Sequence, residues 1–247
     1  MDPTAHQTVT LNGGADLQGF RQALRVLIWS FITPEQITWK THAGADSFGD
    51  QAPAPYGEAG KPIILPRSVS DLIGLVVCHS DPLKYARLYE LIWRMKGPHE
   101  ADPYAFARAK DELVQTLECM KEDVAEDIRR MRERVRFREM HDRVAGNRFI
   151  AWFEPEHFII EAAAPVFIDR FGSIDWTILT PKGCLWWDRK ELSIGSPASR
   201  PDALETEAAH IQWRPHRASV FNPARTEMAD TRWRRHTRRW TETPGAG

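Results

Sequence analysis

The segment Phe-Glu-Pro-Glu-His, residues 153–157, places two carboxylates beside an imidazole. It follows an apolar run typical of a buried strand, and a second apolar run comes after it. Catalytic groups are often displayed where a strand ends near a helix start, and a carboxylate beside a histidine can tune it as an acid–base catalyst. The alternative is a turn in which Pro155 fixes the bend and Glu156 faces solvent. Spacing alone favours the turn, and Glu154 and His157 remain the candidate catalytic residues.

A second candidate site begins near residue 134. From there onward, arginine side chains alternate with apolar ones. This period of two is typical of a half-buried strand. If the strand pairs through a hairpin with the next apolar run, Arg136 and Arg138 lie beside Ile150 and Trp152 on one face. Arginine neutralises phosphates and tryptophan stacks on bases, so the face predicts a contact with nucleic acid. The alternative is a face covered by a helix, with the arginines paired to acidic side chains.

The C-terminal segment 231–240, TRWRRHTRRW, repeats this combination of residue types, with five arginines and two tryptophans in ten positions. At helical spacing such side chains can line a phosphate backbone, so Arg234 and Arg235 are candidate DNA contacts. The alternative is a solvated chain end. We expect residues 227–247 to form a basic tail that could link to a glycosylase domain.

Composition narrows the class of protein. The chain has 247 residues, 42% hydrophobic and 27% charged, which is ordinary for a globular protein with a substantial core. We expect no membrane partner, because no apolar stretch approaches the roughly 18–20 residues of a span. The N-terminal residues lack the features of a secretion signal, so we expect a cytoplasmic protein. Cys78, Cys119 and Cys184 form no CxxC pair, and we predict neither a metal site nor a cofactor.

Hydrophobic periodicity predicts the elements that must position these residues. An apolar helix face runs over 17–31 with Asp16 as its N-cap, and Asp102-Pro103 opens another helix whose apolar positions continue to Val124. A later helix is predicted to begin near Pro165, because proline is poorly tolerated inside one. Residues 176–188 read as a hairpin around a Thr-Pro-Lys-Gly turn. We therefore predict an α+β fold, with a mostly antiparallel sheet of about five to six strands and helices packed around it.

Several long motifs occur in one order along the chain: CHSDPLKYARLYELIWR (78–94), VRFRE (135–139), FIAWFEPEHFIIEAAAPVFIDRF (149–171), WTILTPKGCLWWD (176–188) and FNPAR (221–225). In these motifs the chain resembles the bacterial family described as probable DNA metabolism proteins. The resemblance covers residues 7–235. Members of that family often precede a uracil-DNA glycosylase domain of the family 4 or crosslinking type.

The resemblance implies a role in DNA repair without assigning a reaction to any residue. Its implied partners are DNA and either a uracil-DNA glycosylase, fused or separate, or a radical-SAM protein similar to DNA photolesion lyases. We take Lys182, Asn222 and Arg225 of the shared motifs as further candidate DNA-binding residues. Residues 1–226 are expected to form a single domain of this family.

Three functions are consistent with the sequence. The favoured one is a DNA-binding accessory domain that engages damaged or single-stranded DNA for a glycosylase or lyase in base excision repair. The second is an enzyme acting on DNA or a nucleobase, with His157 and Glu154 as acid–base residues. The third is a protein-interaction scaffold whose acidic helix face, 111–127, docks a partner.

Overall fold

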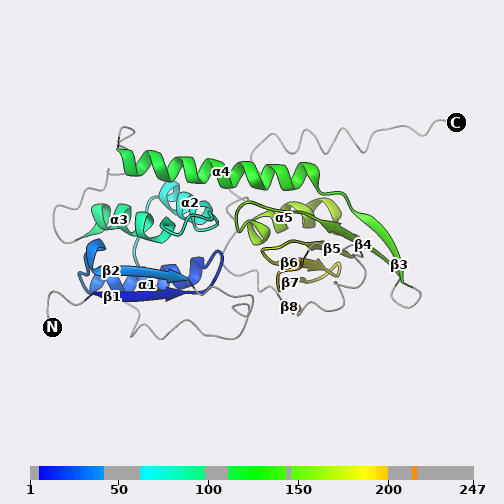
Figure 1. Ribbon diagram of the computed structural model, residues 1–247, viewed down its shortest axis with the longest axis horizontal. Coiled ribbons are helices and arrows are strands. Elements are labelled where there is room, and N and C mark those ends of the chain that lie inside the picture. Colours follow the sequence, from blue (N-terminus) through cyan, green and yellow to red (C-terminus); the bar gives the residue numbers. More distant parts are fainter. Residues whose placement is uncertain (1–5, 42–61, 98–110, 143–145, 200–212, 216–247) are drawn as a thin grey trace.

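The structure, a computed structural model, describes residues 6–41, 62–97, 111–142, 146–199 and 213–215. These ranges contain five α-helices, one 3₁₀ helix and two β-sheets, so the predicted α+β class is confirmed. The elements divide into an N-terminal group and a C-terminal group, and the long helix α4 lies along both (Figure 1). The predicted domain boundary at residue 226, the basic tail and its arginines lie outside the described residues.

The N-terminal group combines a two-stranded parallel sheet with three α-helices and one 3₁₀ helix. Its elements are β1 (Gln7–Leu11), α1 (Leu17–Trp29), the 3₁₀ helix η1 (Pro34–Gln36), β2 (Ile37–Thr41), α2 (Arg67–Val76) and α3 (Lys84–Lys96). The predicted N-cap of α1 is confirmed. The Asp16 side chain accepts hydrogen bonds from the backbone N–H of Gly19 at 2.7 Å and of Asn12 at 3.0 Å.

Helix α4 (Glu112–Arg134) packs against α2, α3 and α5. The prediction that Asp102-Pro103 opens this helix is wrong. Asp111 has an extended backbone and caps the helix, because its side chain accepts hydrogen bonds from the N–H groups of Leu113 and Val114. The Asp102-Pro103 pair lies outside the described residues.

The C-terminal group is built on a six-stranded sheet in the order β3-β4-β5-β6-β7-β8. Its strands are β3 (Arg138–Asp142), β4 (Gly146–Trp152), β5 (Trp176–Leu179), β6 (Cys184–Trp187), β7 (Leu192–Gly195) and β8 (Trp213–Pro215). Neighbours are antiparallel except β4 and β5, which are parallel because α5 crosses between them. The predicted 176–188 hairpin is confirmed, whereas the strand expected from 134 begins only at Arg138.

Helix α5 (Ile160–Phe171) contains Pro165 in its interior, so the predicted start near that proline is wrong. Proline removes the hydrogen bond that would reach the carbonyl of Glu161 in the first turn. The helix nevertheless buries Ile160, Val166 and Phe167, and it packs against both α4 and the sheet. This burial of apolar surface offsets the local cost of the proline.

One apolar core runs through both groups and covers one face of the six-stranded sheet. A second, smaller cluster forms on the opposite face from Ile150, Leu179, Cys184 and Ala198, with Trp152 packed against it. In the described part of the chain, no helix combines the length and apolar character needed to cross a membrane.

We expect Asp16→Ala to lower the free energy of unfolding by about 1 kcal/mol, because two backbone N–H groups lose their acceptor at the start of α1. Urea unfolding followed by circular dichroism measures this change. Asp71→Ala is the control, because that carboxylate makes only a 3.9 Å ion pair with the exposed Arg67. Equal losses in the two variants would contradict the assigned cap.

Candidate functional site

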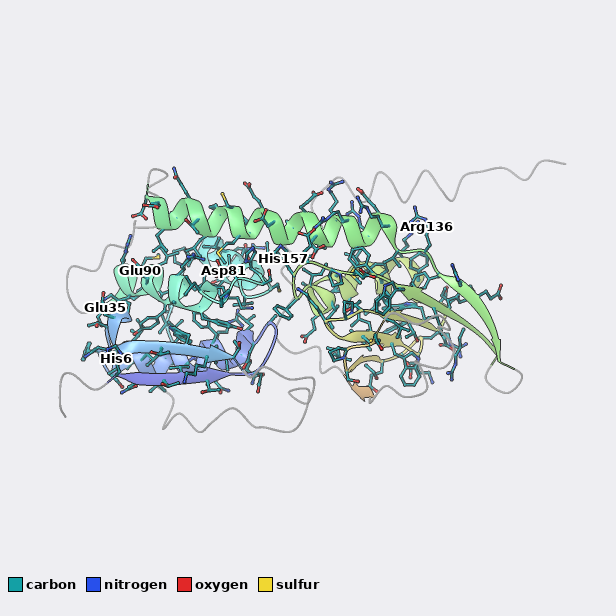
Figure 2. The ribbon with its side chains drawn as sticks, in the orientation of Figure 1. His6, Glu35, Asp81, Glu90, Arg136 and His157 are labelled. Carbon is teal, nitrogen blue, oxygen red and sulfur yellow. The ribbon has the colours of Figure 1, made fainter. Side chains whose placement is uncertain are left out.

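The loop between β4 and α5 carries His157 into the junction of the two groups, next to α4 (Figure 2). Its backbone N–H donates to Asp127 Oδ2 of α4 at 2.9 Å. Asp127 is only 1% exposed, so its carboxylate depends on protein donors in place of water. This hydrogen bond fixes the loop to the helix that spans both groups.

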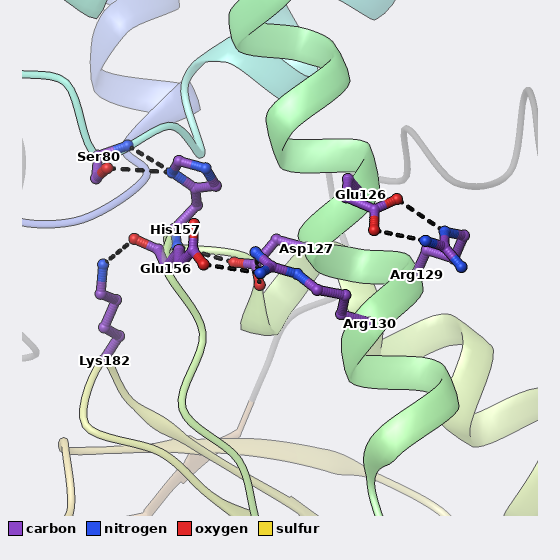
Figure 3. A network of polar contacts seen from close by, with 8 residues as sticks. All are labelled: Ser80, Glu126, Asp127, Arg129, Arg130, Glu156, His157 and Lys182. Carbon is purple, nitrogen blue, oxygen red and sulfur yellow. Dashed lines mark hydrogen bonds and ion pairs between the residues drawn. The ribbon is translucent and has the colours of Figure 1, made fainter.

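The His157 ring reaches the turn before α3 (Figure 3). Its Nδ1 accepts a hydrogen bond from the Ser80 backbone N–H at 3.2 Å, and Ser80 Oγ lies 3.1 Å from the same nitrogen. His79 stacks on this ring with centroids 4.3 Å apart, and its own Nδ1 accepts from the Asp81 N–H. Because each Nδ1 accepts a backbone N–H, both rings are neutral with the proton on Nε2.

Burial lowers the pKa of both imidazoles below the ordinary value. Desolvation is the main cause for each, and for His157 the neighbouring His79 is the next. Asp123 opposes the lowering of the His79 pKa. Asp127 opposes the lowering of the His157 pKa, and Lys182 adds to it. Protonation would place like charges on two stacked rings, so the neutral pair is the stable form near pH 7.

Arginine and lysine side chains complete the network around the loop (Figure 3). Arg130 of α4 donates to Glu156 Oε1 at 2.7 Å and to Asp127 Oδ1 at 3.2 Å. The hydrogen bond from Arg130 lowers the pKa of Glu156. Lys182, in the turn between β5 and β6, donates to the Glu156 carbonyl. The Glu156 side chain is 65% exposed, as the turn interpretation expected, and Glu156 also joins α4 to the sheet through these two contacts.

Glu154, the second candidate catalytic residue, belongs to a different contact. Its Oε1 accepts a hydrogen bond from the Trp152 indole N–H at 2.9 Å, at the exposed end of β4. No hydrogen bond links Glu154 to His157 within the described residues, and the carboxylate that contacts His157 is Asp127. The two candidate catalytic side chains thus stay separate, although they are three positions apart in the chain.

A buried ammonium group lies beside this network. Lys84 Nζ donates to the carbonyls of Gly14, Val77 and His79 at 2.7–2.8 Å, and burial lowers its pKa to about 8. The ammonium group also lies 4.9 Å from the ring centroid of Phe158. All three ammonium donors are used, so Lys84 holds three segments together.

Sequence reasoning missed the residues that hold His157 in place. Asp127 did carry a signal, because it lies three residues after Val124 on the apolar stripe of α4, where an unpaired carboxylate would be costly. Ser80 and His79 lie 77 and 78 residues before His157, and no local pattern connects them to it.

The strand register brings a different set of predicted residues together. Arg138 pairs with Ile150, as predicted, and because side chains two apart share a face, Trp152 and Arg148 lie on the same face. Both arginines are exposed and Trp152 is half-buried. This basic-aromatic face, defined as Arg138, Arg148 and Trp152, lies opposite the face that packs on the main core.

The remaining candidate DNA-binding residues have other positions. Arg136 precedes β3, and its guanidinium donates to the carbonyls of Glu133 and Val135 at the end of α4, so its predicted place opposite Trp152 is wrong. Lys182 lies in the β5–β6 turn, with its ammonium 4.7 Å from the Phe158 ring centroid. Asn222, Arg225, Arg234 and Arg235 lie outside the described residues. Among those described, no group of three histidine, cysteine or acidic side chains could hold a metal ion.

Comparison with known proteins gives one match. The family model DUF4130, described as a domain of unknown function, matches residues 84–242. The match begins at the start of α3 and includes α4, α5 and the six-stranded sheet. It leaves out β1, α1, β2 and α2. No curated protein and no solved structure matches the chain.

We expect Asp127→Ala to lower the free energy of unfolding by roughly 3 kcal/mol, because the His157 N–H is left buried without an acceptor and Arg130 loses a carboxylate. Urea unfolding followed by tryptophan fluorescence measures the change. Glu126→Ala is the matched control, since this exposed acid on the same helix pairs only at the surface and should cost about 0.5 kcal/mol. A similar small loss for both variants would refute the structural role of Asp127.

The two histidines should make stability depend on pH. Their pKa values are lower in the folded chain than the ordinary value of about 6.5. At a pH between the folded pKa and the ordinary pKa, the unfolded chain therefore binds more protons than the folded chain. Their contribution to stability is complete above about pH 6.5 and decreases as pH falls toward the folded pKa values. Urea midpoints at several pH values test this, and a His79→Gln/His157→Gln variant should lose that part of the dependence. An unchanged pH profile in the double variant would exclude the pair as its source.

Proposed function

This chain belongs to the DUF4130 family, and we propose that it is a DNA-binding protein that serves as an accessory factor in DNA repair. The observation that carries the proposal is the basic-aromatic face of the six-stranded sheet. There Arg138 of β3 and Arg148 of β4 lie on the same face of the sheet as Trp152. Guanidinium groups attract phosphates, and an indole ring offers a surface to bases.

The charges on this face are free to act on a ligand. Within the described residues, neither Arg138 nor Arg148 forms an ion pair with a carboxylate, whereas Arg129 and Arg130 of α4 are each held by two acids. An arginine already paired with a carboxylate gains less from a phosphate, because the first pair must be broken. The β3–β4 hairpin also extends past the end of α4 (Figure 1), and the Arg138 and Arg148 side chains on it are exposed.

The resemblance to probable DNA metabolism proteins supplies the repair context. On that basis the partner is a uracil-DNA glycosylase or a radical-SAM repair protein, to which this chain delivers DNA. The proposal requires no catalytic group in the chain itself, so it is consistent with the separate positions of Glu154 and His157.

The two alternative functions have weaker support. For an enzyme using His157, the favourable observation is Ser80 Oγ at 3.1 Å from Nδ1, but that nitrogen also accepts a backbone N–H. Glu154, its intended partner, bonds to Trp152. For a scaffold using the acidic face of α4, Glu126 is already paired with Arg129.

Fluorescence anisotropy with labelled oligonucleotides across a range of salt concentrations tests DNA binding. We expect affinity to fall linearly on a log–log plot, and the Arg138→Ala/Arg148→Ala variant to reduce the slope by roughly 1.5, because two phosphate contacts are lost. Lys40→Ala/Arg67→Ala is the matched control, since it removes two exposed cations from the N-terminal group. The proposal fails if the chain binds no DNA at low salt, or if the two double variants behave alike.

A further inference from the structure

The Trp152 side chain is held in a fixed position at the end of β4. Part of its surface packs on the small cluster that includes Ile150, Leu179 and Ala198, and the rest stays exposed. A ring anchored in this way loses little conformational entropy when a ligand stacks on it. Two tryptophans of neighbouring strands, Trp176 and Trp187, pack in the main core on the opposite face. A third, the half-buried Trp186, is paired with Thr177 and lies on the same face as Trp152, two strands away from it.

Glu154 provides a second anchor for the same ring. Its carboxylate accepts the indole N–H at 2.9 Å, and it follows Trp152 by two residues. Because this N–H is the only hydrogen-bond donor of the side chain, a ligand meets Trp152 mainly through the apolar face of its ring. Recognition through a ring face alone does not depend on the base sequence.

The neighbouring charges fit a nucleic acid strand that runs along β4. Arg148, Ile150 and Trp152 follow each other on one face at about 6.7 Å intervals. Arg138 adds a second guanidinium from the adjacent strand, opposite Ile150. Positive charge therefore lies one or two steps from the aromatic ring, and the carboxylate beside the ring, that of Glu154, lies at its N–H edge. One strand can place a base on the face of Trp152 and phosphates near the arginines.

We propose that this face selects single-stranded over duplex DNA, an inference that rests on the proposed DNA binding. A base of the single strand stacks on Trp152, and Glu154 is the residue that positions the ring. The bases of a duplex are already stacked on each other and are not available to a side chain on a flat sheet. A duplex would contact the arginines through its phosphates alone. The selectivity therefore depends on Trp152, whereas the electrostatic attraction depends on Arg138 and Arg148.

The test compares the affinities of the full chain for a single-stranded oligonucleotide and for its duplex, at one salt concentration. We expect Trp152→Ala to weaken single-strand binding roughly ten-fold and to leave duplex binding nearly unchanged. Trp152→Phe should retain part of the preference, because it keeps an aromatic ring at this position. Single-stranded DNA should also quench tryptophan fluorescence in the wild type and much less in Trp152→Ala.

The test of Glu154 measures the ratio of single-strand to duplex affinity, which a purely structural role of this residue would leave unchanged. We expect Glu154→Ala to reduce the ratio of single-strand to duplex affinity several-fold, and Glu154→Gln to restore it, because the amide oxygen can still accept the indole N–H. Trp29→Ala is the matched control, since Trp29 is a 48% exposed tryptophan at the end of α1 in the N-terminal group.

The outcomes separate this inference from the proposal it rests on. Binding of both forms of DNA with a ratio that Trp152→Ala does not change would overturn the single-strand selectivity and leave DNA binding intact. A ratio lowered equally by Trp29→Ala would overturn it as well. Failure to bind either form at low salt would remove the proposed function and this inference together.

Discussion

The arrangement of this protein depends on one buried carboxylate. Asp127 lies in the middle of a helix that spans both groups of elements, and it accepts the backbone N–H of His157 from a loop of the C-terminal group. A carboxylate with 1% exposure is costly unless donors surround it. Arg130 of the same helix supplies one donor to Asp127, and the backbone N–H of His157 supplies the other from the loop. The imidazole that this bond holds in place then reaches across to the Ser80 turn of the N-terminal group.

A second buried charge lies beside the same junction, on its N-terminal side. The Lys84 ammonium draws the carbonyls of Gly14, Val77 and His79 toward a single point. Gly14 has a positive φ of 80°, and a Cβ there would lie 3.4 Å from the Phe158 ring, which itself stands beside the ammonium. Buried polar groups of this kind add specificity as much as stability, because each has only one arrangement that satisfies its hydrogen bonds.

The short acidic segment after β4 divides its residues between two surfaces. Glu154 still follows the alternation of the strand and holds Trp152 on the basic-aromatic face. After the buried Pro155, Glu156 and His157 turn toward α4 and the α3 turn. Neighbouring residues thus connect the candidate DNA surface to the junction of the two groups.

Local patterns in the sequence determined the α+β class, the Asp16 cap, the Thr-Pro-Lys-Gly hairpin and the shared face of Arg138 and Trp152. Each of these features depends on residues close together in the chain or on the alternation of side chains along a strand, and both can be read from the sequence. Tertiary structure alone decided that α5 begins at Ile160 despite Pro165, and that Asp127 rather than Glu154 contacts the His157 loop. The reason is physical: periodicity reports which side of an element is buried, whereas a contact between residues 30 or 77 positions apart depends on how the elements pack.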